Sequence, residues 1–269
     1  MARQPDLTGK TALLTGATGG IGNAIARALH SRGATVKLSG RRAEALESLV
    51  AELGDRAEAL PADLAELEEV RVLAERAGDV DVLVANAALP ASGRLGEFRA
   101  DELDRALFVN LRAPIQLTHA LLPRMIERSS GHLVYISSIA GKVASGGGSL
   151  YSAGKFGLRG FAFALHEELH GTGVGTTTVF PGFIRDAGMF AEADLDLPRG
   201  VGSRTPDQVA AGVLKGIATN RPEIDVAAFD QRLGGWLSGP APRLVAAITR
   251  RGGGQQFADQ LAEGQSNKR

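Results

Sequence analysis

Short apolar runs alternate with longer amphipathic stretches along most of the chain. The runs have the length and the branched apolar residues of strands, and they lie at 10–15, 34–39, 56–60, 81–85, 132–137 and 174–180. Between them, apolar residues recur every three or four positions and predict helices, at about 20–32, 42–53, 64–77, 101–128 and 150–171. This alternation predicts right-handed β-α-β units in an α/β fold. We expect one doubly wound parallel sheet in a single domain, with a layer of helices on each face.

The segment that follows completes this domain, 1–227. A helix is predicted at 206–220, because Thr205 and Pro206 provide a cap followed by a proline in the first turn. A last strand is predicted at about 223–227.

Residues 228–251 form an amphipathic C-terminal extension, which Pro240 and Pro242 divide into two short helical pieces. Three roles are open for it: packing on the same or a neighbouring subunit, a lid over a binding pocket, or association with a membrane surface. We expect packing with partial cover of a pocket. The remaining residues, 252–269, are rich in Gly, Gln and Lys and are predicted to be disordered.

The composition narrows the class of protein. Among the 269 residues, 30 basic and 30 acidic side chains balance, so no net charge draws the protein to nucleic acid or to a membrane. There is no cysteine, which excludes disulfides, thiolate metal sites and thiol catalysis. The chain starts without a signal sequence and has no apolar stretch of the ~20 residues that span a bilayer. We therefore expect a soluble cytoplasmic protein with no nucleic-acid partner, membrane span or metal.

A glycine-rich turn follows the first strand. The strand at 10–15 runs directly into Gly16-Ala-Thr-Gly19-Gly20-Ile-Gly22, and an amphipathic helix comes next. Glycines at this place allow a tight turn and the close approach of a ligand to the backbone, while the helix amino terminus attracts an anion. Strand, glycine turn and helix in this order predict a site for the pyrophosphate of a dinucleotide.

A serine, a tyrosine and a lysine form the second chemical motif. Ser138 precedes Tyr151, and Lys155 lies one helical turn after the tyrosine, where its ammonium can lower the pKa of the phenol. A shift of that pKa from ~10 to ~7 requires about 4 kcal/mol, which the lysine and a cationic cofactor ring can share. With Ser138 holding a substrate oxygen, the group can move a proton to or from an alcohol or carbonyl oxygen.

The order of these motifs resembles that of the short-chain dehydrogenases/reductases, over roughly residues 7–225. The resemblance implies a Rossmann fold and an oxidoreductase that transfers a hydride between a nicotinamide and a carbonyl or secondary alcohol. It implies four catalytic residues: Tyr151 as general acid or base, Lys155, Ser138, and Asn110 as holder of a relay water. The implied cofactor contacts are Gly16, Thr18, Gly20, Ile21, Gly22, Arg41, Arg42, Asp63, Leu64, Asn86, Ala87, Tyr151, Lys155, Pro181, Gly182 and Ile184.

Two arginines predict the form of the cofactor. Arg41 and Arg42 follow the second strand, where a dinucleotide fold contacts the adenosine ribose. An arginine there matches a 2′-phosphate, whereas a carboxylate would bind the 2′-hydroxyl of NAD. We expect NADP(H), with a solvated helix start as the alternative reading of the two arginines.

Four positions depart from the family pattern, and none of them removes a catalytic group. Ala85 and Ala88 replace an asparagine and a glycine, and Gly154 stands where the family usually has serine. Asp186 stands where a threonine usually contacts the nicotinamide carboxamide.

The substrate and the assembly are less well defined by the sequence. Several apolar residues near the expected pocket suggest a hydrophobic ketone or alcohol; they are Leu89, Val143, Phe183, Met189 and Phe190. The helices at 101–128 and 150–171 carry apolar residues on more than one face, and the resemblance implies a homodimer or homotetramer through them.

Three alternatives remain at this point. The spacing of Gly16, Gly19 and Gly22 also fits a sugar-nucleotide epimerase, and the same fold serves cofactor-binding regulators without turnover. His166-Glu167-x-x-His170 matches the zinc-protease pattern, although histidines and glutamates near a helix end are usually a solvated or interface face.

Overall fold

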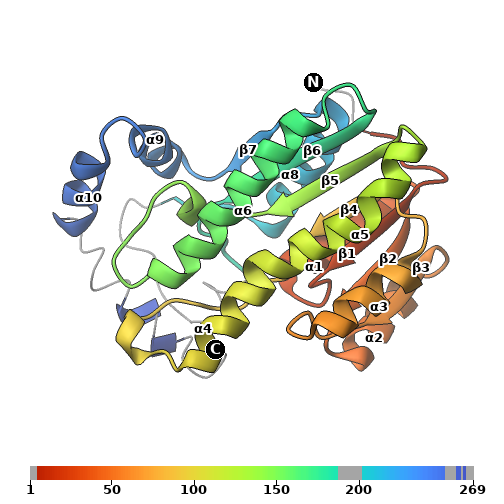
Figure 1. The fold of residues 1–269 in the computed structure, drawn as a ribbon, viewed down its shortest axis with the longest axis horizontal. Helices are drawn as coiled ribbons and strands as arrows, with labels where there is room; N and C mark the ends of the chain where they lie inside the picture. Colours follow the sequence, from red (N-terminus) through yellow and green to blue (C-terminus); the bar gives the residue numbers. More distant parts are fainter. Residues whose placement is uncertain (1–4, 187–201, 252–258, 262, 265–269) are drawn as a thin grey trace.

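Seven parallel strands in the order β3-β2-β1-β4-β5-β6-β7 form the centre of the molecule (Figure 1). The computed structural model describes residues 5–186, 202–251, 259–261 and 263–264. The strands are β1 (Thr11–Thr15), β2 (Thr35–Gly40), β3 (Ala57–Pro61), β4 (Val82–Ala85), β5 (Gly131–Ile136), β6 (Val174–Pro181) and β7 (Glu223–Val226). The predicted α/β fold with a doubly wound parallel sheet is confirmed, and each predicted strand is present.

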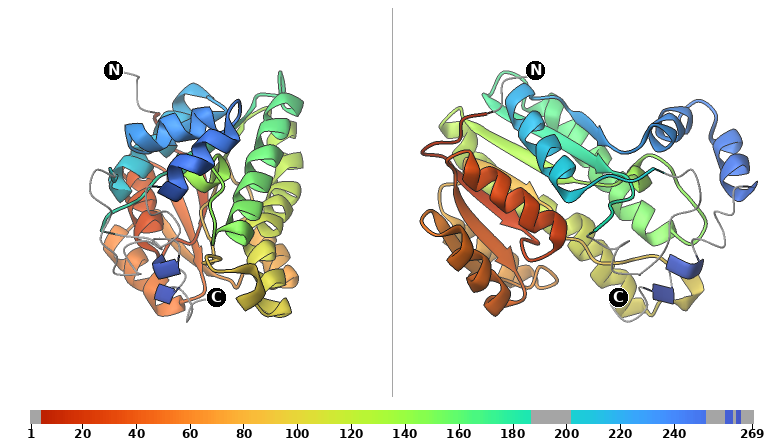
Figure 2. Two further views of the ribbon diagram at one scale, coloured as in Figure 1. Left: turned by 90° about the vertical axis from the view of Figure 1, so that its left-hand side faces the viewer. Right: turned by 180° about the vertical axis from the view of Figure 1, so that it is seen from behind.

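A layer of helices covers each face of the sheet, as Figure 2 shows. One layer holds α1 (Gly20–Ser31), α2 (Ala43–Leu53) and α8 (Pro206–Thr219); the other holds α3 (Leu67–Ala77), α4 (Ala100–Leu107), α5 (Ala113–Glu127) and α6 (Ser149–Glu168). Successive strand residues point to opposite layers, so Leu14 packs under α1 while its neighbour Leu13 packs under α3 and α5. Strand β6 is buried along its whole length, as expected for a parallel sheet covered on both faces.

The helix predicted at 101–128 is interrupted by a π-helical segment, Phe108–Arg112, between α4 and α5. At its end, the amide of Ala113 donates to the carbonyl of Phe108, five residues earlier. A π segment inserts one residue into the helical repeat, and such segments are frequent at functional sites. The segment contains no glycine or proline, so the sequence gives no sign of a break in the helix there. It contains Asn110, one of the residues assigned to catalysis.

The C-terminal extension forms two helices, α9 (Phe229–Leu237) and α10 (Pro242–Arg251). Figure 1 places both at the end of the molecule toward which the strands point. The tail predicted to be disordered, 252–269, lies largely outside the described residues. Among the helices that the structure describes, none combines the length and apolar character needed to cross a bilayer.

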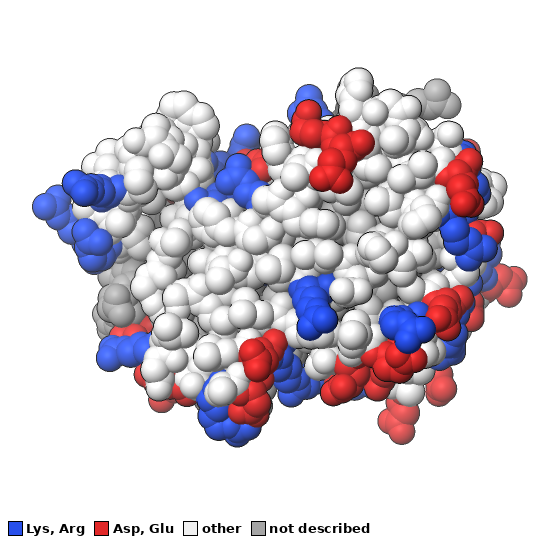
Figure 3. Space-filling view, viewed as in Figure 1, with Lys and Arg blue, Asp and Glu red and all other residues white. Residues whose placement is uncertain are grey.

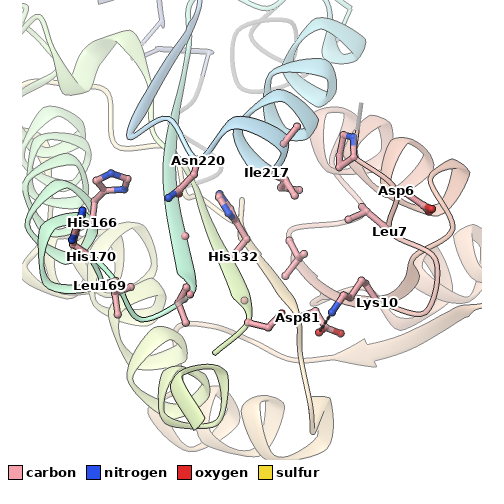
Figure 4. A pocket seen from close by; sticks show the side chains of 18 of the residues that line it. Asp6, Leu7, Lys10, Asp81, His132, His166, Leu169, His170, Ile217 and Asn220 are labelled. Carbon is pink, nitrogen blue, oxygen red and sulfur yellow. Dashed lines mark hydrogen bonds and ion pairs between the residues drawn. The ribbon is translucent and has the colours of Figure 1, made fainter. Parts of the chain in front are cut away.

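A cavity of about 820 Å³ lies at the amino ends of the strands (Figure 4). It is lined there by His132 of β5, by His166 and His170 near the end of α6, and by Asn220. His132 is 7% exposed, and its Nε2 lies 3.0 Å from the Thr177 hydroxyl. Burial, with a smaller contribution from His166, lowers the pKa of His132 to about 4.

The first prediction concerns the pH dependence of stability. Because folding lowers the pKa of His132 from about 6.5 to about 4, its contribution is fully present above pH 6.5 and is lost as the pH falls toward 4. Between pH 6.5 and 4, the unfolding free energy of the wild type should fall by about 3 kcal/mol because of His132. We expect His132→Gln to lack this part of the fall. Urea unfolding at several pH values measures this. His119→Gln, a change at an exposed histidine, is the control and should leave the pH profile as in the wild type.

Candidate active site

The ends of β1 and β4 are held together by two side chains. The hydroxyl of Thr15, which is 1% exposed, accepts hydrogen bonds from the amides of Asn86 (3.0 Å) and Ala87 (3.1 Å). The side-chain amide of Asn86 donates in return to the carbonyls of Thr15 and Gly16, each at 3.1 Å. Three predicted cofactor contacts, Gly16, Asn86 and Ala87, therefore lie together at the carboxyl ends of adjacent strands.

The glycine turn leaves no room for side chains. Gly16 has a φ of +65°, and a Cβ on it would lie 2.8 Å from the Cα of Ala87. A Cβ on Gly22 would lie 2.1 Å from the carbonyl oxygen of Gly16. Helix α1 begins at Gly20 with no side-chain cap and no acidic residue in its first turn. Its first amides are therefore free of a capping side chain, and the turn fits the pyrophosphate of a dinucleotide.

The end of β2 carries the two predicted arginines. Arg42 donates to the carbonyl of Thr18 at 3.2 Å, which ties the second strand end to the glycine turn. The side chain of Arg41 is exposed. On the neighbouring strand end, Asp63 accepts a hydrogen bond from the amide of Ala65 (3.0 Å). The guanidinium of Arg105 on α4 lies 3.9 Å from that carboxylate, an ion pair that sequence reasoning did not predict.

Lys155 lies under the end of β5. Its ammonium donates to the carbonyl of Ile136 at 2.9 Å, and the residue is 2% exposed. The Ser137 hydroxyl donates to the carbonyl of Lys155 at 3.1 Å. A Cβ on Gly141 would come within 2.8 Å of that same carbonyl oxygen, so the turn after β5 packs tightly on α6. Burial lowers the pKa of Lys155 to about 8.

Tyr151 lies next to Lys155 and is hydrogen bonded to Ser138. The ammonium of Lys155 lies 5.7 Å from the centre of the Tyr151 ring. Burial raises the pKa of Tyr151 to about 12, and a hydrogen bond with Ser138 opposes that shift in part. This differs from the expected pKa of ~7, because Lys155 alone does not overcome the desolvation of the phenol. In the protein by itself, Tyr151 is protonated at neutral pH.

Asn110 is fixed by the π segment. It is 2% exposed, its Oδ1 accepts from the amide of Leu89 (2.7 Å), and its Nδ2 donates to the carbonyl of Leu89 (3.0 Å). A Cβ on Gly154 of α6 would lie 3.2 Å from the Cβ of Asn110. The glycine that departs from the family pattern thus lies against Asn110, where a larger side chain would crowd it.

The end of β6 carries the remaining predicted contacts. The amide of Gly182 donates to the carbonyl of Val226 (3.0 Å), and Ile184 is buried. Asp186 has a φ of +69°, and its carboxylate lies 3.6 Å from the guanidinium of Arg185. Met189 and Phe190, two of the predicted apolar residues, lie outside the described residues.

The structure also places a residue here that sequence reasoning missed. The side chain of Gln231 on α9 bonds to the backbone just after Gly182. Nothing in the amphipathic pattern of 228–251 distinguished this glutamine from a solvated one.

The His-Glu-x-x-His pattern belongs to a different region. His166 and His170 lie toward the opposite end of α6 from Tyr151 and line the cavity of Figure 4. The Nδ1 of His166 lies 3.0 Å from the carbonyl oxygen of Thr176. Within the described part of the chain, no three His, Asp or Glu side chains are grouped so that they could bind a metal ion.

Comparison with known proteins agrees with this geometry. A family model described as short chain dehydrogenase matches residues 10–197. The chain is 38% identical over 227 residues to the ketoacyl reductase HetN of Nostoc sp., a match covering 82% of this chain and 79% of the relative. It is 39% identical over 180 residues to the 3-oxoacyl-(acyl-carrier-protein) reductase FabG of Rickettsia conorii, covering 67% and 75%. The crystal structure of a metagenomic short-chain oxidoreductase in complex with NADP superposes with a TM-score of 0.69 at 34% identity, covering 83% of this chain and 98% of that one.

The second prediction tests the junction of β1 and β4. Thr15→Val removes the acceptor of two part-buried amides, and an unpaired buried donor costs about 1–3 kcal/mol. We expect the unfolding free energy to fall by about 2–4 kcal/mol, measured by urea denaturation. Ser39→Ala is the matched control. Ser39 pairs with Thr15 across the sheet and is fully buried, but its hydroxyl has no hydrogen-bond partner among the described residues, so its removal should be neutral or stabilising. Equal losses in both variants would contradict the assignment.

Proposed function

The chain belongs to the short-chain dehydrogenase/reductase family, and from that premise we propose that it reduces an apolar ketone with NADPH, using Tyr151 as the general acid. One observation carries this proposal above the others. Lys155 is buried on the carbonyl of Ile136, next to the ring of Tyr151, which in turn is hydrogen bonded to Ser138. A cation, a phenol and a second hydroxyl converge at the strand end, next to the proposed cofactor site.

The proposed reaction places one proton and one hydride on the substrate. NADPH, when bound, supplies the hydride to the carbonyl carbon. Ser138 and Tyr151 both donate to the carbonyl oxygen and orient it. As the C–H bond forms, the carbonyl π electrons move to oxygen, which takes the proton of the Tyr151 hydroxyl and becomes an alcohol. The positive charge of Lys155 stabilises the phenolate that remains.

The protonated state of Tyr151 suits the role of acid that ketone reduction requires. With a pKa of about 12, Tyr151 carries its proton at neutral pH and can act as an acid. Oxidation would require the phenolate, which the buried site disfavours until a bound cofactor adds positive charge. The preference for NADPH proposed from the arginines at the β2 end points the same way.

The substrate class is proposed from the surroundings and from the relatives. Leu89 is buried beside Asn110, and Phe183 follows the end of β6, so the substrate side of the site has apolar neighbours. Two relatives carry the names of a ketoacyl reductase and a 3-oxoacyl-(acyl-carrier-protein) reductase. We therefore propose a 3-oxoacyl thioester or a similar apolar ketone.

We also propose a homodimer or homotetramer. Helices α4, α5 and α6 expose large apolar side chains, namely Leu107, Ile126, Phe156 and Phe163. Figure 3 shows a broad face with few charged residues over α5 and α6. A face of this kind on a monomer would leave apolar area in water that a two-fold contact can bury.

The third prediction tests the general acid. Tyr151→Phe removes one hydroxyl, and the loss of acid–base catalysis should lower kcat by about 10²–10⁴-fold while NADPH still binds. NADPH absorbance with a panel of ketones measures turnover, and titration calorimetry measures binding. Tyr135→Phe changes the only other tyrosine, whose hydroxyl bonds to Thr118 inside the core, and should leave kcat unchanged. A Tyr151→Phe enzyme with near-normal kcat would overturn the mechanism.

The fourth prediction concerns cofactor choice. We expect kcat/KM to favour NADPH over NADH by at least about tenfold, because a charged contact to the 2′-phosphate contributes roughly 1.5–3 kcal/mol. Arg41→Ala should remove most of this preference by raising KM for NADPH alone. Arg76→Ala, which removes an exposed arginine of α3, controls for total charge. Equal use of both cofactors by the wild type would contradict the proposal.

A further inference from the structure

The side chain of Gln231 joins two parts of the chain that flank the end of β6. Its Oε1 accepts from the amide of Phe183 at 3.3 Å, and its Nε2 donates to the carbonyl of Gly202 at 2.6 Å. The same two parts also bond directly, because the amide of Arg204 donates to the carbonyl of Phe183 at 2.8 Å. The side-chain amide of Gln231 therefore holds Phe183, just after the carboxyl end of β6, and Gly202, in the segment that leads into α8.

Two glycines make this approach possible. A Cβ on Gly182 would lie 1.9 Å from the Oε1 of Gln231, so no other residue fits while the amide stays in place. A Cβ on Gly202 would lie 2.5 Å from the Cβ of Ala228, at the start of α9. The close contact of α9 with both segments therefore depends on a glycine in each of them.

The far end of α9 contacts the turn that carries Ser138. A Cβ on Gly235 would lie 3.3 Å from the Cδ1 of Ile139, the residue after Ser138. The hydroxyl of Ser238 donates to the carbonyl of Lys142 at the end of that turn. Lys142 is itself fixed to β7, with its ammonium 2.9 Å from Glu223 and 2.6 Å from Asp225.

Helix α9 is attached mainly through these polar contacts. None of its residues is buried, and its large apolar side chains face outward, with Phe229 76% and Trp236 72% exposed. Burial of apolar area therefore contributes little to its position or to the stability of the domain. Its contacts include the turn that carries Ser138 and the segment Pro181–Phe183, and the proposed substrate would lie between these two.

We propose that Gln231 is a positioning residue for the substrate: through it, α9 fixes the distance between the Ser138 turn and the segment Pro181–Phe183. This inference rests on the proposed function, because it assumes that the substrate carbonyl binds at Ser138. We expect the larger effect on the substrate, since the contacts described above join α9 to the Ser138 turn and to the segments beside the end of β6. A displacement of about 1 Å at a reacting centre can cost up to 10²-fold in rate.

The test compares three variants of the full-length enzyme. Gln231→Met keeps the length of the side chain but removes both hydrogen bonds. Gln231→Glu keeps the acceptor for the Phe183 amide but sets a carboxylate oxygen against the Gly202 carbonyl, so it isolates the contribution of the Gly202 bond. Arg232→Ala removes the exposed neighbour on the same helix and serves as the control. We expect Gln231→Met to lower kcat/KM for the ketone about tenfold, mostly through KM, to change the Kd for NADPH much less, and to leave the Tm unchanged.

Two further measurements do not depend on turnover. Amide hydrogen exchange at Phe183 should be faster in Gln231→Met than in the wild type, because the acceptor of that amide is gone. The affinity for the ketone in the dead-end complex with NADP⁺, measured by calorimetry, should fall by the same factor as KM rises. If Tyr151 is not the acid, these two measurements still decide the role of Gln231.

The outcomes separate the possibilities. Faster exchange and weaker ketone binding in Gln231→Met alone support the proposal. Unchanged ketone affinity, or an equal effect in Arg232→Ala, overturns it. A fall in Tm together with a loss of NADPH affinity as large as the loss of ketone affinity also overturns it, because the residue would then be structural only.

Discussion

The buried ammonium of Lys155 is the constraint around which the site is built. A cation that is 2% exposed requires a hydrogen-bond acceptor, and the carbonyl of Ile136, at the last residue of β5, provides it. This one contact fixes the start of α6 against the end of the sheet. Tyr151 lies one turn before the lysine, so its place follows from the same contact, and the turn after β5 brings Ser138 to it. The bond from Ser137 to the carbonyl of Lys155 and the close packing of Gly141 hold the same strand, turn and helix together.

The carboxyl ends and the amino ends of the strands differ in the polar groups that they present. At the carboxyl ends of the strands, the glycine turn and the start of α1 have no capping side chain, and Ser138, Tyr151 and Lys155 lie together. At the amino ends, His132 bonds to Thr177 and His166 to the carbonyl of Thr176. This difference explains why the histidine pattern on α6 has no part in the proposed chemistry, although the same helix carries Tyr151 at its other end.

Much of the fold and the central part of the site could be predicted from the sequence, because their signals are local. Strands of a parallel sheet are continuous apolar runs, and Gly22 is placed by a close contact with the carbonyl oxygen of Gly16 in the same turn. The π segment could not be predicted, because Phe108–Arg112 has an ordinary helical composition and its form depends on the bonds between Asn110 and Leu89. Gln231 was missed for a similar reason: its partners, Phe183 and Gly202, are distant in sequence. The raised pKa of Tyr151 could not be predicted either, because it depends on the burial of the phenol in the folded protein.

The π segment also sets the phase between α4 and α5. One residue of an α-helix corresponds to a rotation of about 100°, so a regular helix through 108–112 would turn one half relative to the other by that angle. The apolar side chains of α4 and those of α5 would then no longer face the same neighbours, and the amide of Asn110 would point away from Leu89. The extra residue therefore acts as a spacer that brings the faces of two helices into register around one asparagine. Sequence changes in this stretch are constrained in length as well as in composition, even though its residues look interchangeable with those of any helix.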